Sequence, residues 1–467
     1  MWRLYCDMEP IFTNDAVVFG LLCLILGGVF YTSKLPAFRR FYGIVPTLVL
    51  CYFLPALLYW PLGLIAPEWF DHGLLTFLGE KGLVLPDTGM SFGQIKDWLE
   101  TQGLAKADYG KFAHKSQLYF VASRYLLPAS LLLFCVGIDM KGIIGLGPKA
   151  LIMFLTATLG VIIGGPVALL VVTNLMPGLI NVSPDELWRG LSTIAGSWIG
   201  GGANQAAMKE IYKVPDSLFG TMVVVDVLVA NIWMAALLYG AGNFEKIDRW
   251  FKADNSAIAA LEQRVANYRA SIEQVATTRH LFVLLAVAFG GVALSHIVAD
   301  WAVPLLEKSS DWLKAARLES LLEGFFWIVL VATTVGLGLS FTSARKLEGV
   351  GASTWGSLFI YILVATIGMK MNVGEIFDNL GLFAIGVVWM LVHCTLLLVV
   401  AKLIRAPFFF VAVGSQANIG GAASAPIVAS AFSPALAPVG VLLAVLGYAL
   451  GTYGAIVCAM LMQLVVG

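Results

Sequence analysis

Two glycine-rich motifs interrupt an otherwise apolar sequence. The first, 196–206, reads GSWIGGGANQA, and the second, 414–426, reads GSQANIGGAASAP. Each glycine destabilises a helix by about 1 kcal/mol relative to alanine, so each motif predicts a broken helix. In a membrane, broken backbone is tolerated only where it is buried in protein or lines a polar cavity. Helix N-termini attract anions and C-terminal carbonyls can hold Na⁺, so both breaks are candidate binding sites.

The polar residues of these motifs favour a binding site over simple close packing of helices. Small residues alone would satisfy close packing, whereas amide side chains are costly inside a membrane. We therefore interpret the motif residues as candidate ligands for a solute or an ion. They are Ser197, Gly200, Gly201, Gly202, Asn204, Gln205, Ser415, Gln416, Asn418, Gly420, Gly421 and Ser424.

A single acid, Asp226, lies nine residues into the apolar stretch 217–241. At 1.5 Å per residue this depth is roughly 13 Å, near the middle of a hydrocarbon core about 30 Å thick. A carboxylate there is a functional candidate by default, as a Na⁺ ligand or a proton carrier. The alternative is a structural carboxyl, neutral or paired with Arg124 or Lys370. The expected suppliers of further oxygen ligands are Asn204, Gln205, Ser415 and Asn418.

The elements that must position these residues are membrane helices. Of the 467 residues, 59% are hydrophobic and only 12% are charged, and the net charge is zero. This composition excludes a soluble protein and leaves no basic surface for nucleic acid. We predict an all-α polytopic membrane protein. Its twelve apolar stretches lie near 15–32, 43–66, 117–138, 149–174, 188–208, 217–241, 280–300, 321–342, 352–371, 379–402, 405–430 and 437–466.

The two motifs also indicate an internal repeat. Ile199-Gly200-Gly201 aligns with Ile419-Gly420-Gly421 at an offset of 220 residues, close to half the chain. Glycine-interrupted segments in corresponding positions are typical of transporters built from two halves. We predict a first half at 1–241, with a long extramembrane loop at 67–116, and a second half at 280–467.

A polar linker, 242–279, separates these halves. Within it, apolar residues recur at alternating spacings of three and four, which predicts a helix with one apolar stripe. The helix is either an interfacial linker packed on the bundle or a short coil that joins two copies in a homodimer. The stripe consists of Ile258, Leu261, Val265, Tyr268 and Ile272.

Counting and charge disagree about orientation. If the loop 34–42 is cytoplasmic, strict alternation places 140–149 inside and 242–279 outside, yet 242–279 carries six basic residues. Basic loops are retained in the cytoplasm. We therefore predict a cytoplasmic linker and an inverted second half, with one segment that fails to cross fully or one crossing that was missed.

Several segments resemble an uncharacterised bacterial membrane family, domain of unknown function 819, from about residue 15 onward. The resemblance rests on 124–128 (RYLLP), 131–134 with Asp139, the two motifs and Asp226. It implies a multi-pass protein of the bacterial inner membrane. The broken helices look like those of bile-acid–sodium symporters, auxin carriers and cation–proton antiporters, which is an analogy of fold. The sequence departs from the family pattern at Trp198, Gln416, Ala422, Ser424 and Val227, so we expect its substrate to differ from that of relatives.

We expect an ion-coupled secondary transporter that moves a small polar or anionic solute by alternating access, in an elevator-like manner. Its partners are the solute and membrane lipid, and it needs no cofactor beyond the coupling ion, Na⁺ or H⁺. An uncoupled channel is the alternative. An intramembrane enzyme is disfavoured, because a protease of the aspartyl type needs two acids and a serine enzyme needs a base, for which His393 is the candidate. No GxxxxGK[ST] motif for ATP occurs.

Overall fold

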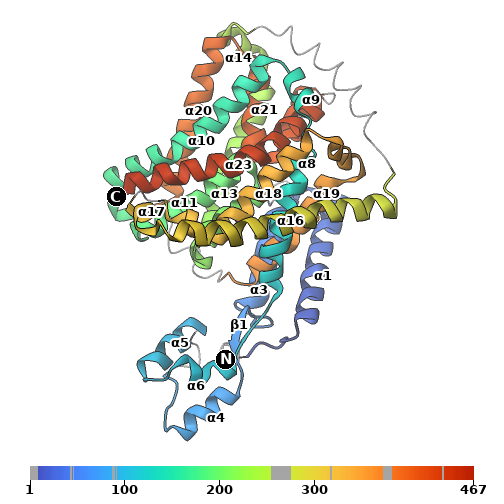
Figure 1. Cartoon of the computed structure of the whole chain (residues 1–467). Helices are drawn as coiled ribbons and strands as arrows, with labels where there is room; N and C mark the ends of the chain where they lie inside the picture. The colour runs from blue at the N-terminus through green and yellow to red at the C-terminus, as the bar shows by residue number, and fades with distance from the viewer. Residues whose placement is uncertain are drawn as a thin grey trace. The chain divides into compact units, whose positions relative to one another are not determined.

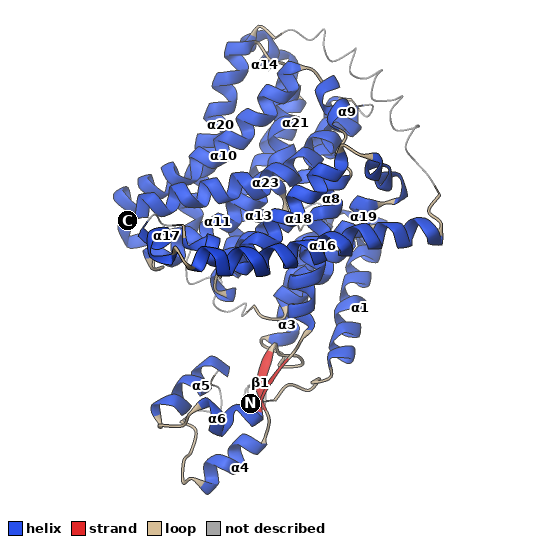
Figure 2. Ribbon diagram, in the orientation of Figure 1, coloured by secondary structure: helices blue, strands red, loops and turns tan. Residues whose placement is uncertain are grey.

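The structure, a computed structural model, is almost entirely helical in the residues that it describes (Figures 1 and 2). Its strands, β1 (Glu68–Phe70) and β2 (Ala113–Lys115), form a two-stranded antiparallel sheet. The all-α prediction is therefore confirmed at this level. The structure describes residues 9–42, 45, 47–86, 90, 92–253, 275–315, 318–371, 381–433 and 436–466. The helix predicted at 258–272 lies outside these described residues.

Fewer helices than predicted are long enough to cross a membrane. Seven described helices pass by length and hydropathy, and two bent pairs raise the number of candidate spans to nine. The bent pairs are Pro36–Tyr42 with Thr47–Tyr59 (α3), and α18 (Gly324–Ser340) with η6 (Ser343–Val350), which meet at 99°. The seven helices are α1 (Asp15–Ser33), α7–α8 (Leu118–Val136), α10 (Pro148–Leu175), α13 (Asp216–Ala241), α16 (Thr278–Glu307), α20 (Gly381–Ile404) and most of α23 (Ala437–Val466).

The chain forms two compact units, 1–123 with 361–376, and 124–360 with 377–467. In the first unit, the predicted loop 67–116 contains a small folded domain. Helices α4 (Gly73–Glu80), α5 (Phe92–Thr101) and α6 (Lys106–Tyr109) accompany the sheet. Their core consists of Phe70, Leu74, Leu78, Ile95, Leu99, Leu104 and Tyr109.

The second unit contains both glycine motifs. One group of its helices is α8 (Leu127–Val136), α16 and α18, which approach closely because Gly291 and Gly336 lie against Leu132. Beside them Asp139 is buried and accepts a hydrogen bond from Arg345 Nη1 at 2.9 Å. In the other group, Gly160 and Gly164 of α10 make room for side chains of α20, as small residues do between membrane helices.

Each glycine motif interrupts a helix where the sequence predicts it. Helix α11 (Pro184–Gly200) is followed by α12 (Gly202–Ile211), and α21 (Phe408–Ile419) by α22 (Gly421–Phe432). Gly201 and Gly421 have φ angles of 76° and 57°. These left-handed conformations are readily adopted by glycine, which has no Cβ.

Both interrupted helices turn back on themselves. The ring of Trp188, in the first turns of α11, lies 5.1 Å from that of Tyr212, just beyond α12. Likewise the ring of Phe409, at the start of α21, lies 5.3 Å from that of Phe432, the last residue of α22. Because the outer ends of each pair meet, each pair is a helical hairpin, named here hairpin 1 (α11–α12) and hairpin 2 (α21–α22). Two of the twelve predicted crossings are therefore not straight crossings.

The bases of the two hairpins lie at opposite ends of α13. Gly190 of hairpin 1 packs on Leu218, near the start of α13. Phe408 of hairpin 2 packs on Gly240, near its end. The 26 residues of α13 span about 39 Å at 1.5 Å per residue. The hairpins therefore run into the second unit from opposite ends.

This arrangement changes the number of crossings on which the alternation argument depends. Lys149 Nζ, at the start of α10, donates to the carbonyl of Arg405 at 3.2 Å. Lys402 lies over the ring of Trp250 in α14 (Phe244–Phe251), and Figure 1 shows α14 beside the ends of α20 and α21. The described part of the linker thus shares one end of the unit with the loop before α10, because hairpin 1 returns the chain to the end from which it started.

Candidate functional site

The tips of the two hairpins meet on α23. A methyl group on Gly447 would lie 2.9 Å from the carbonyl oxygen of Ile199 and 3.3 Å from that of Ala417. These carbonyls belong to the last turns of α11 and α21, where oxygens lack partners within the helix and carry partial negative charge. Two helix C-termini therefore converge on one glycine, which is a favourable place for a cation.

Glycines also allow α11 to approach α23 at the backbone. A methyl group on Gly200 would lie 2.7 Å from Gly451 Cα and 2.8 Å from the carbonyl oxygen of Gly447. Gly447 and Gly451 are four residues apart, the spacing that brings membrane helices into close contact. Gly200, predicted as a binding residue, thus has a packing role that explains its type.

Asp226 joins both arms of hairpin 1 at its tip. Trp198 Nε1, from α11, donates to Oδ1 at 2.6 Å, and Gln205 Nε2, from α12, donates to Oδ2 at 2.9 Å. The Ser197 hydroxyl is a third hydrogen-bonding neighbour. The acid is 5% exposed, and neutral donors offset part of the cost of burying it. These partners are neutral, and Arg124, one of the two cations in the structural alternative, pairs with Glu210.

Asn204 supports the turn of hairpin 1. Its Nδ2 donates to the carbonyls of Gly200 at 3.0 Å and Tyr448 at 3.1 Å. Its Oδ1 accepts a hydrogen bond from Thr452 at 2.6 Å. Both amide hydrogens are used, so in this conformation Asn204 fastens the tip to α23.

Asn418 supports hairpin 2 by the same pattern. Its Nδ2 donates to the carbonyls of Gly414 at 3.0 Å and Phe154 at 3.2 Å. Its Oδ1 accepts from Thr158 at 2.8 Å. In each hairpin the asparagine thus donates to the carbonyl four residues before it. It also bonds to two residues of a neighbouring helix that are four positions apart, donating to the carbonyl of the first and accepting from the threonine hydroxyl of the second. The hydrogen bonds therefore make Asn204 the counterpart of Asn418. Aligning the glycines of the two motifs instead places Asn204 opposite Ser424.

The two glutamines, by contrast, each keep one buried oxygen without a hydrogen-bond donor. Gln205 donates to Asp226, and Gln416 Nε2 donates to Ser424 Oγ at 2.7 Å. The Gln416–Ser424 bond joins the two helices on either side of the break at Gly420. A side chain at Gly420 would collide with the Ser424 hydroxyl. An unpartnered buried acceptor costs about 1–3 kcal/mol, which a bound cation or a donor group of a solute would offset.

Ser415 connects three helices beside this region. Its Oγ accepts from Trp233 Nε1 of α13 at 2.8 Å and lies 2.8 Å from His393 Nε2 of α20. The pairing matches the one that a serine enzyme would require. Both Ser415 and His393 are fully buried, however, so the geometry fits a structural connection between α13, α20 and α21.

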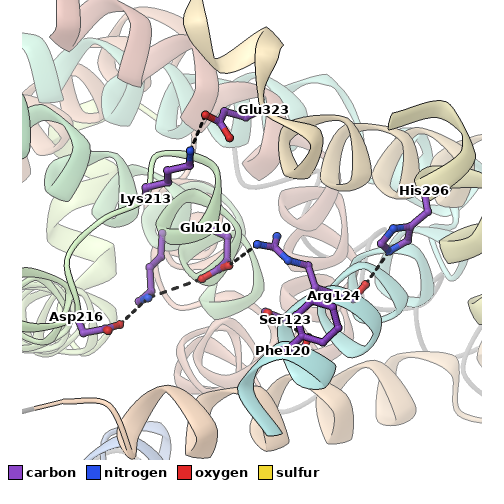
Figure 3. Close-up of polar contacts among 9 residues, drawn as sticks. Phe120, Ser123, Arg124, Glu210, Lys213, Asp216, His296 and Glu323 are labelled. Carbon is purple, nitrogen blue, oxygen red and sulfur yellow. Dashed lines mark hydrogen bonds and ion pairs between the residues drawn. The ribbon is translucent and has the colours of Figure 1, made fainter. Parts of the chain in front are cut away.

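A chain of charges at the base of hairpin 1 was not identified from the sequence. Lys209 Nζ lies 2.8 Å from Asp216 Oδ1 and 3.7 Å from Glu210 Oε1, and Arg124 Nη2 lies 3.6 Å from Glu210 Oε2 (Figure 3). Lys209 is only 4% exposed, and the four residues are formally neutral together. The one sequence signal was two adjacent charges, 209–210, directly after the predicted stretch 188–208.

Two ion pairs, Arg124 with Glu210 and Lys213 with Glu323, join hairpin 1 to the group of α8, α16 and α18. Arg124, just before α8, stacks at 4.3 Å over the ring of Phe325 in α18, and its carbonyl oxygen lies 3.1 Å from His296 Nε2 of α16. Lys213, beyond α12, forms a 2.7 Å ion pair with Glu323, which precedes α18 (Figure 3). The base of hairpin 1 is therefore an ionic interface between helix groups.

Comparison with known proteins places these features in a family. Residues 102–465 match the family described as "Protein of unknown function (DUF819)". The uncharacterized membrane protein YjcL of Bacillus subtilis (strain 168) is 24% identical over 344 residues, which cover 73% of this chain and 82% of the relative. The family match begins at residue 102, later than the predicted residue 15, and includes both hairpins and Asp226. The chain is a multi-pass membrane protein and belongs to the DUF819 family, as its motifs predicted.

Proposed function

We propose that the protein is an ion-coupled secondary transporter of the bacterial inner membrane that works by alternating access. The observation that carries this proposal is the pair of hairpins whose bases lie at opposite ends of α13 and whose tips meet at Gly447. Such hairpins would be re-entrant, each opening toward one face of the membrane. Interrupted helices that meet at the membrane midplane are the usual binding sites of secondary transporters.

Opposite entry of the hairpins supports the predicted inverted relation of the two halves. In this proposal the twelve apolar stretches divide between crossing helices and hairpins. The group of α8, α16 and α18 would be the static partner in an elevator-like movement of a homodimer.

Na⁺ is the coupling ion that these groups favour. Hard cations prefer carboxylate, carbonyl and amide oxygens. The hairpin tips offer the Asp226 carboxylate, the converging carbonyls of Ile199 and Ala417, and the unpartnered Gln205 Oε1. A proton would need only the carboxylate and would leave the remaining oxygens unused. The solute, small and polar or anionic, would bind between the tips, where Gln416 and Ser424 face the second break.

Charge movement in proteoliposomes on a solid-supported membrane tests the coupling site without a known solute. Na⁺ replaces choline at constant ionic strength, and the transient charge is recorded. The wild type should give a response that saturates with Na⁺, and Asp226→Asn should lose it more than about tenfold, the effect of 1.4 kcal/mol in binding. Asp185→Asn, an exposed acid on the same hairpin, is the matched control and should respond normally.

Melting temperature and oligomer size of each variant show whether it is folded. A full Na⁺ response from folded Asp226→Asn would refute the coupling site. A steady current that does not saturate with Na⁺ would favour the channel instead.

A further inference from the structure

One end of the second unit is strongly basic and carries few acids. On α14 and its C-cap and on the α20–α21 turn, the only exposed carboxylate is Glu245. None of the exposed cations there forms an ion pair with a carboxylate of the described chain. We call this set the basic end, and it consists of Lys246, Arg249, Lys252, Lys402 and Arg405.

Exposed apolar side chains lie among these cations. Trp250 is 57% exposed and Leu403 is 76% exposed. Lys402 Nζ lies 4.0 Å from the centre of the Trp250 ring. Aromatic residues at headgroup level, with lysine stems along apolar surface and ammonium groups in water, are typical of the membrane interface.

The same short helix is bonded to hairpin 2. Asp248 of α14 is buried, and its Oδ1 accepts from the backbone N–H of Phe408, the first residue of α21, at 2.7 Å. Phe244 of α14 lies 5.8 Å from Phe432, the last residue of α22. A ligand bound to the exposed side of α14 would therefore contact a helix that is itself bonded to the base of hairpin 2.

We propose that the basic end binds the headgroup of an anionic phospholipid, and that the bound lipid holds α14 against hairpin 2. Five cations that have no ion-pair partner among the described residues, beside interfacial aromatic and leucine side chains, match an anionic headgroup with its acyl chains. Each basic residue near such a surface contributes to attraction that salt screens.

The test uses the full-length protein in nanodiscs of phosphatidylglycerol or phosphatidylcholine. The wild type should melt at a higher temperature in phosphatidylglycerol, and the difference should shrink as salt rises. Lys402→Gln with Arg249→Gln should lose most of the difference. Lys308→Gln, an exposed lysine beyond α16, should keep it.

Hydrogen exchange at 408–411 separates lipid binding from a general change in stability. Phosphatidylglycerol should slow exchange there in the wild type but not in the double variant. Equal melting temperatures in both lipids, or a full lipid effect in the double variant, would overturn the proposal. So would an equal shift from inorganic phosphate in phosphatidylcholine, since the ligand would then be free phosphate.

Discussion

The two hairpins have similar tips but different bases. At both tips an asparagine fastens the turn and a glutamine keeps a buried oxygen without a donor. The base of hairpin 1 combines one aromatic contact, Trp188 with Tyr212, with ion pairs around Lys209, whereas that of hairpin 2 is an aromatic cluster around Phe409 without ion pairs among the described contacts. Ion pairs can exchange partners or open to water, whereas a packed aromatic cluster opens only by exposing its surface. The difference predicts that hairpin 1 opens more readily and that its opening depends on salt.

Removing the central cation of hairpin 1 should have the largest effect on stability. Lys209→Met leaves Asp216 and Glu210 without their buried cation, and loss of one partner of a buried ion pair costs about 3–5 kcal/mol. The melting temperature of Lys209→Met should fall sharply. The double variant Lys209→Met with Asp216→Leu should lose less, because it lacks one of the acids that the single variant leaves unpaired. If the single variant melted like the wild type, the ionic base would not hold hairpin 1.

Truncation at the base of hairpin 2 should cost a similar amount but respond differently to salt. Phe409 is 1% exposed, and Phe→Ala in a packed interior costs about 3–5 kcal/mol. Thermal unfolding of Phe409→Ala at low and high salt should show a constant loss. A loss that changes with salt as much as that of Lys209→Met would remove the contrast between the bases.

A smaller effect is expected where hairpin 1 crosses α23. Gly200→Ala would place a methyl group against backbone atoms of Gly447 and Gly451, and such overpacking costs about 1–3 kcal/mol. Gly290→Ala is the matched control, because nothing lies within 4 Å of the added methyl group. Melting temperatures should fall for the first and stay level or rise for the second.

The smallest effect concerns the outer ion pair of hairpin 1. Lys213 and Glu323 are both exposed, and exposed pairs contribute about 0.2–1 kcal/mol. Lys213→Gln should lower the melting temperature slightly at low salt and not at high salt. A loss as large as that of Lys209→Met would show that the outer pair, not the buried chain, holds the base.

The sequence located the breaks but not the paths of the helices. Consecutive glycines mark Gly201 and Gly420 because their destabilisation of a helix is local. Whether the chain then continues or turns back depends on contacts between distant residues, such as Trp188 with Tyr212. The prediction of twelve crossings counted each hairpin as a crossing, since hydropathy measures composition and not direction.

The sequence likewise identified residues of the site without assigning the role of each side chain. Depth in an apolar stretch identified Asp226, and it lies at the tip of hairpin 1. The sequence could not distinguish Asn204, whose amide is bonded on both sides, from Gln205, whose oxygen is not. That distinction depends on α23, which is more than 240 residues away in sequence. The folded domain in 67–116 was missed because its core is small and its sequence mixed.

Cysteine accessibility measures whether the two hairpins enter from opposite faces of the membrane. Asp185→Cys lies at the start of α11, and Lys402→Cys lies at the end of α20 beside the base of hairpin 2; both side chains are exposed. In a background without native cysteines, an impermeant maleimide is added to right-side-out and to inside-out vesicles. One variant should label only in the first preparation and the other only in the second, with Lys402→Cys on the cytoplasmic face. Labelling of both from the same face would show that the hairpins enter from one side and are not inverted.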